Sequence, residues 1–157
     1  MPKQIESTTD LVAETMTDFI NVDLDIYSRS DLEPLVTALG ERVDVLYVGR
    51  QRRTCAAHLE LPFGFKPYNA DAMIRRFAAL IDSLPKAQRK LWDAAETREF
   101  DIGVQAAMQP FCYEMLLSAE AVDAVARLNA RIRFTVYAPE VPRKIARKKR
   151  PSKPATV

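Results

Sequence analysis

The chain has 157 residues, a formal net charge of +2, and 48% hydrophobic residues. This length suits a single domain with a substantial core. There is no apolar run long enough to span a bilayer, and the polar N-terminus lacks the apolar segment of a secretion signal. These features disfavour membrane and secreted proteins, so we expect a cytoplasmic location.

The charge is unevenly distributed along the chain. From Pro139 onward there are seven Lys and Arg residues and one Glu, a net charge of +6, which leaves −4 for the rest. We therefore expect a flexible lead-in over residues 1–17, one globular domain over 18–138, and a basic, disordered tail over 139–157.

The first half of the domain reads as a strand, a helix and a hairpin. Residues 18–27 alternate between apolar and polar, which is typical of a strand with one buried face. A helix ending at Gly40 follows, and a second alternating strand reaches about residue 49. A basic turn leads to a third strand over residues 55–61, close enough to the second to form a hairpin.

The second half begins with two helices. Asn69 or Asp71 is predicted to cap a helix that reaches about Leu84, and Pro85 to end it and begin the next. A strand is predicted over residues 98–108. The chain then closes with the unit 113–138, which reads as a short strand, a helix capped by Ser118 and a final strand.

In the final strand, Ile132, Phe134 and Val136 share one side and are predicted to lie buried under helices. The whole order is β-α-β-β-α-α-β-β-α-β. Strands that are apolar on one face only predict an α+β two-layer sandwich, with a mixed or antiparallel sheet and helices on one face. LGERV near residue 40 is echoed by LNARI near residue 130, which indicates either a duplicated half or a favoured packing motif.

The pattern resembles a bacterial family of domains of unknown function, whose members are similar to small cytoplasmic immunity proteins encoded beside toxin genes. The resemblance covers about residues 18–138. It rests on the helix ending in LG, the RT-containing turn, the DIGVQA strand and the closing LLSAEAVDAVARLNARIRFTVYA. It implies a non-enzymatic inhibitor of a partner protein. The third strand departs from the family pattern, because CAAHLEL stands where a Trp is expected.

The outward positions of the strands supply the candidate partner-binding residues: Asp23, Asp25, His58, Asp101, Arg131 and Arg133. Three hypotheses compete for them. They could bind another protein, three carboxylates and an imidazole could hold a divalent cation or act as acid and base, or they could simply be a solvated sheet face. No catalytic, metal-binding or cofactor-binding residue is predicted, and Cys55 and Cys112 are expected to be buried thiols.

The tail supports a second function, since dense basic residues neutralise phosphates without reading sequence. The residues concerned are Arg143, Lys144, Arg147, Lys148, Lys149, Arg150 and Lys153. A purely solubilising tail, or contact with an acidic protein or membrane surface, remains open. The leading hypothesis is thus a non-enzymatic binding protein of the immunity type. A nucleic-acid-associated accessory protein is the alternative, and a metal-dependent enzyme comes third.

Overall fold

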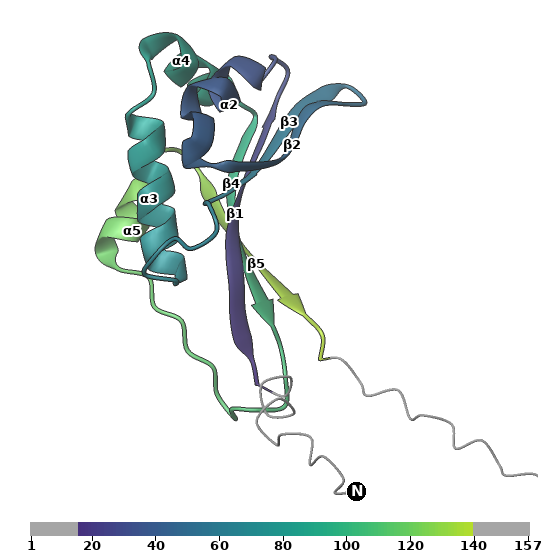
Figure 1. The fold of residues 1–157 in the computed structure, drawn as a ribbon, viewed down its shortest axis with the longest axis vertical. Helices are drawn as coiled ribbons and strands as arrows, with labels where there is room; N and C mark the ends of the chain where they lie inside the picture. The colour runs from purple at the N-terminus through teal and green to yellow at the C-terminus, as the bar shows by residue number, and fades with distance from the viewer. Residues whose placement is uncertain (1–15, 140–157) are drawn as a thin grey trace, which may run out of the picture.

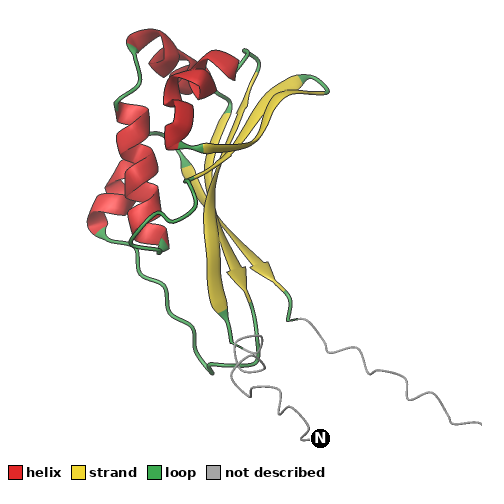
Figure 2. Cartoon of the chain, viewed as in Figure 1, coloured by secondary structure: helices red, strands yellow, loops and turns green. Residues whose placement is uncertain are grey.

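A computed structural model describes residues 16–139, which form one open five-stranded sheet with helices on one face (Figures 1 and 2). The strands are β1 (Asp18–Ser28), β2 (Asp44–Gln51), β3 (Thr54–Glu60), β4 (Thr97–Gln105) and β5 (Arg131–Tyr137). The helices are α2 (Glu33–Leu39), the short 3-10 turn η1 (Gly40–Arg42), α3 (Ala70–Asp82), α4 (Lys86–Ala94) and α5 (Ala119–Arg127). The predicted α+β two-layer architecture is confirmed.

β1 is the central strand of the sheet, whose order is β2-β3-β1-β4-β5. It pairs antiparallel with both β3 and β4, whereas β5 runs parallel to β4, so the sheet is mixed. The alternation of β1 places Val22, Leu24 and Ile26 under the helices with no exposed surface. A register shift between Phe19 and Asn21 ends this alternation at the start of the strand.

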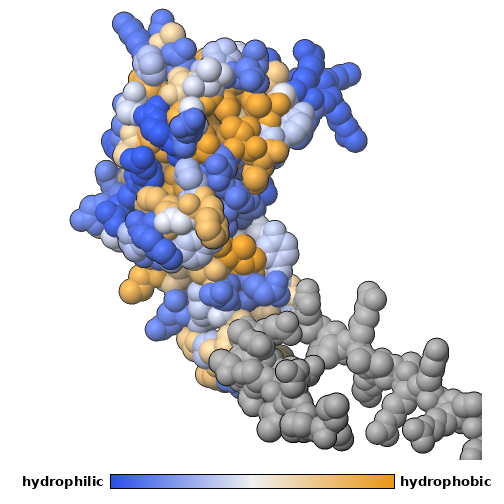
Figure 3. Space-filling view, in the orientation of Figure 1, coloured by the Kyte–Doolittle hydropathy of each residue, from blue (hydrophilic) through white to orange (hydrophobic). Residues whose placement is uncertain are grey.

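The helical layer is held by caps that the sequence predicts. The Asn69 side chain accepts a hydrogen bond from the N–H of Ala72 at the start of α3, and Ser118 accepts one from Ala121 at the start of α5. Each cap satisfies a backbone donor that has no partner within its helix. In Figure 3 the outer side of this layer is largely hydrophilic, and apolar surface lies between it and the hydrophilic tip of the β2–β3 hairpin.

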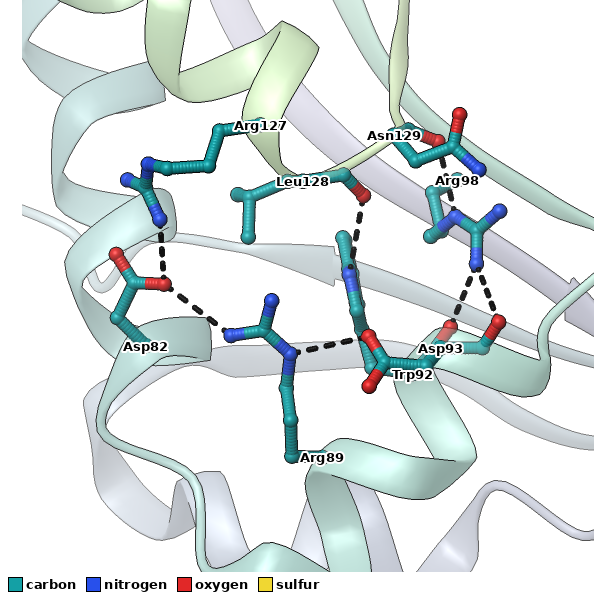
Figure 4. A network of polar contacts seen from close by, with 8 residues as sticks. All are labelled: Asp82, Arg89, Trp92, Asp93, Arg98, Arg127, Leu128 and Asn129. Carbon is teal, nitrogen blue, oxygen red and sulfur yellow. Dashed lines mark hydrogen bonds and ion pairs between the residues drawn. The ribbon is translucent and has the colours of Figure 1, made fainter.

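One buried arginine connects the sheet to two helices (Figure 4). Arg98 on β4 donates to the carbonyl oxygens of Trp92 (2.8 Å) and Asp93 (3.0 Å) in α4, and to that of Asn129 (3.0 Å) after α5. The Trp92 indole donates to the carbonyl of Leu128 at 3.2 Å. These bonds occupy carbonyls at the ends of both helices, so they fix α4 and α5 on the same part of the sheet.

The predicted sixth strand is wrong. Residues 106–118 have no regular strand pairing after β4, and they cross from the far end of the sheet back to the helical layer (Figure 1). β4 therefore ends at Gln105, and Met108, the last residue of the strand predicted over 98–108, is 82% exposed. The chain forms no further strand here because β5 runs parallel to β4, and two parallel neighbours require a long crossover connection between them.

The predicted burial of the last strand is also largely wrong. Phe134 is 59% exposed and Val136 is 63% exposed, whereas Ile132 is partly buried against the core. Within residues 16–139, β5 has a neighbouring strand on one side only, and its far end extends beyond the short helix α5 (Figure 2). The apolar alternation therefore predicted the strand correctly, but it did not predict whether helices cover the apolar side of that strand.

The segments LGERV and LNARI lie in connections of different topology, the first between β1 and β2 and the second between β4 and β5. β3 lies between β1 and β2, whereas β4 and β5 are direct neighbours. The echo of LGERV in LNARI thus corresponds to two different connections. Cys55 is partly buried and Cys112 is exposed, so the prediction of a buried thiol is wrong for Cys112. In the described part of the chain, every helix is too short or too polar to cross a membrane.

Candidate functional site: the open face of the sheet

The face of the sheet opposite the helices gathers the six residues predicted to bind a partner. Antiparallel pairing places Asp25 opposite His58 and Asp23 opposite Asp101. The parallel pair of β4 and β5 then places Asp101 beside Arg133. In a sheet, side chains at paired positions project to the same side. All six therefore belong to one surface, which we call the open face.

Asp25 and His58 form a pair at the β1–β3 junction. His58 Nδ1 lies 2.6 Å from Asp25 Oδ1, and the imidazole sits near the rings of Tyr27 and Tyr47 at 5.6 and 5.8 Å between centroids. Nε2 is 3.5 Å from the side-chain amide of Gln51. A carboxylate at Nδ1 fixes the ring orientation. Tyr47 and Gln51 were not predicted to take part, because their positions on β2 depend on the hairpin register.

Both predicted arginines are already engaged by carboxylates. Glu99 has 2% exposed surface and is paired with Arg131 and with Arg133, and Arg133 also lies 3.7 Å from Asp101. Asp101 accepts a hydrogen bond from the Thr135 hydroxyl at 2.7 Å. Both arginines of β5 thus pair with acids across the sheet. The two arginines therefore have a structural role, because they neutralise the buried carboxylate of Glu99.

Among the residues that the structure describes, Asp23 and Glu60 have no such cation. Neither forms an ion pair with any residue within 16–139, and Asp23 receives a hydrogen bond from the Asn21 amide at 3.0 Å. Burial raises the pKa of Asp23 to about 7, and the neighbouring carboxylates of Glu60, Asp25 and Asp101 add to this rise. A carboxyl group with this pKa is close to half protonated at neutral pH.

Glu60 and Glu99 belong to the open face although neither was among the predicted partner-binding residues. The alternation that turns Asp101 and His58 outward turns these two outward as well. That signal was present in the sequence. The burial of Glu99 could not be predicted from the sequence. It arises from the two arginines on β5, of which Arg131, the nearer in sequence, is 32 residues from Glu99.

The open face does not have the geometry of a metal site. Over residues 16–139, no group of three or more His, Cys, Asp or Glu side chains is placed to hold a metal ion. The Asp25–His58 pair resembles part of an acid–base arrangement, but a nucleophile in hydrogen-bond reach is lacking among the described side chains. The basic residues of the tail, Arg143 to Lys153, lie outside the described residues.

A concave region lies on the helical side of the sheet. A cavity of about 830 Å³ is lined by the start of β1, residues 68–71, Arg75 and the segment 113–118. Its polar groups are largely occupied: Asp71 accepts hydrogen bonds from the N–H of Ser118 and from Arg75, and the Tyr68 hydroxyl donates to the carbonyl of Ile20. The cavity thus has few free polar groups with which to orient a ligand.

Comparisons with known proteins yield nothing to set beside this geometry. No family model, no curated protein and no solved structure matches the chain.

Proposed function

We propose that the chain is a non-enzymatic binding protein whose open face docks onto a basic surface of another protein, in the manner of an immunity-type inhibitor. The observation that carries this proposal is the pair Asp23 and Glu60 near the middle of the face, which has no cationic partner among residues 16–139. The central strands β3, β1 and β4 present five carboxylates there, namely Asp23, Asp25, Glu60, Glu99 and Asp101. Only two guanidinium groups and one imidazole pair with them in the described structure.

The charge arrangement suits a cationic group from a partner. A Lys or Arg side chain placed between Asp23 and Glu60 would supply the opposite charge that these carboxylates lack. Binding would then release the proton that Asp23 holds near neutrality, because a nearby cation favours the charged carboxylate. Charge complementarity of this kind gives specificity and a fast association rate.

The rigid strands also favour a protein partner over nucleic acid at this face. Strands hold side chains in more defined positions than loops do. The centre of the face is acidic, which repels phosphate, and single-stranded RNA binding on sheets relies on exposed aromatic platforms and positive charge. A nucleic-acid function would have to come from the tail, which lies outside the described residues.

The test is a charge reversal at Asp23 and Glu60. A protein retained by the tagged native chain is purified, and its affinity is measured for wild type, for the double variant Asp23→Lys/Glu60→Lys, and for Glu41→Lys as a control at an exposed site in η1. We expect the double variant to lose affinity by about 100-fold or more, since like charges that face each other across an interface cost several kcal/mol. The control should bind as wild type. Equal affinity of a folded double variant would remove the open face from the interface.

A further inference from the structure

β5 is an edge strand whose only charged residues, and so its only evident protection against pairing with another strand, are Arg131 and Arg133. It pairs with β4 over seven consecutive positions without a register shift, and nothing in the described chain pairs with its other side. Natural edge strands are commonly blunted by bulges, prolines or lysines. The segment Arg131–Tyr137 contains none of these.

The hydrogen-bonding groups that face the free edge can be identified from one contact. The carbonyl of Tyr137 accepts the N–H of Ala106 at 2.9 Å, so Tyr137 points its backbone groups toward β4. Backbone groups alternate in direction along a strand. The N–H and C=O groups of Ile132, Phe134 and Val136 therefore point to the free edge, which offers three donors and three acceptors.

The same three residues carry the apolar side chains of β5. Phe134 and Val136 are 59% and 63% exposed, although their register neighbours on β4, Ile102 and Val104, are buried. An edge that combines free backbone groups with exposed apolar side chains is a template for strand addition. The question is which strand would fit it.

We propose that the occupant is a second copy of this chain, paired antiparallel through β5 about a two-fold axis at Phe134. This goes beyond the proposed function, since it concerns an edge of the sheet and not its open face. The axis places Phe134 opposite Phe134 of the other copy, and Ile132 opposite Val136 at both ends. Each of these is a hydrogen-bonded pair, so all the free-edge donors meet acceptors and two sheets become one.

The register also avoids placing like charges opposite each other. Arg133 faces Thr135 of the other copy, and Arg131 faces the Tyr137 ring, which suits a guanidinium group. The two Arg133 residues become diagonal neighbours. Each is already neutralised within its own chain, by Glu99 and by Asp101. Electrostatic repulsion therefore does not oppose this register.

The other edge of the sheet is a poorer template. β2 also exposes apolar side chains, including Leu46 at 56%, but its pairing with β3 shifts register between Val45 and Tyr47. Such an irregularity bends a strand and interrupts its ladder. The helices also leave room at β5, since its far end extends beyond α3 and α5 (Figure 1).

The experiment uses charge at the axis. Phe134→Glu and Phe134→Lys each place two like charges opposite one another in the dimer, whereas a mixture of the two places opposite charges there. Sedimentation equilibrium of the full chain is measured at tens of micromolar for wild type, each variant and their equimolar mixture. Leu46→Glu serves as the matched control on the other edge. Circular dichroism confirms that each variant is folded, which is expected because position 134 is exposed in the single chain.

We expect wild type and Leu46→Glu to sediment as dimers, each Phe134 variant as a monomer, and the mixture as a dimer again. A monomeric wild type would overturn the proposal and leave the edge free for a strand of some other protein. Dimers that persist in both Phe134 variants, that are lost in Leu46→Glu, or that fail to return in the mixture would overturn it equally.

Discussion

Asp23 occupies a setting that is unusual for a carboxylate on the uncovered side of a sheet. It is partly buried among Glu60, Asp25 and Asp101, and these neighbours together with burial raise its pKa to about 7. A raised pKa means that the folded protein binds the proton more tightly than the unfolded chain does. Stability contributed by this residue is therefore greatest at acidic pH and declines as the pH rises toward 7.

Replacing Asp23 by Asn should stabilise the protein at high pH. The neutral amide removes the charge that burial and the neighbouring carboxylates disfavour. We expect Asp23→Asn to exceed wild type by about 1–2 kcal/mol at pH 8, after allowance for its partial exposure, and to match it near pH 4. Urea unfolding across this pH range measures the difference. A variant less stable than wild type at pH 8 would contradict the assignment.

Arg98 is a second residue whose role follows from its contacts, and it serves the fold. Its guanidinium group supplies donors to three backbone carbonyls at the ends of α4 and α5. We expect Arg98→Ala to cost about 3 kcal/mol or more, because buried acceptors without donors are expensive. Arg29→Ala, which removes an exposed ion pair with Glu96, should cost less than about 1 kcal/mol. Similar losses from the two variants in denaturant unfolding would show that the Arg98 bonds are not needed.

At the scale of elements, the alternation of the strands was readable from the sequence, but what covers them was not. β1, β3 and the start of β4 follow the predicted pattern closely. The segment 113–117 has the composition of a strand, yet the chain uses it to return from the end of β4 to the helices. Local composition does not encode whether a neighbouring strand is available for pairing. The predicted burial of β5 is wrong for a related reason, since the position of β5 at the edge depends on the order of the strands in the sheet.

Two phenylalanines separate these cases experimentally. Phe100 on β4 is fully buried, whereas Phe134 on β5 is 59% exposed. We expect Phe100→Ala to lower the free energy of unfolding by about 3–5 kcal/mol, and Phe134→Ala by less than about 1 kcal/mol. The measurement is made in protein dilute enough to remain monomeric. Comparable losses for both would indicate that helices cover β5 after all.

For the whole molecule, the two sides of the sheet differ in what lies on them. One side is occupied by α2 to α5 and the apolar core, and the other gathers charges from four strands that are distant in sequence. The sequence could predict which residues face outward, because alternation is local. It could not predict that Arg131 and Arg133 both pair with Glu99, while Asp23 and Glu60 have no cationic partner within residues 16–139. Under the proposed function, that difference determines which charges are available to a partner.

Carboxyl footprinting tests the use of this side most directly. Carbodiimide coupling to glycine amide labels accessible carboxylates, and mass spectrometry compares the free protein with its complex with the purified partner. If the open face is the interface, Asp23 and Glu60 should be labelled less in the complex than in the free protein. Glu41 and Glu120, which lie in the helical layer, should label equally in both states. Protection of the helical-layer carboxylates, with Asp23 and Glu60 labelled as in the free protein, would contradict the account.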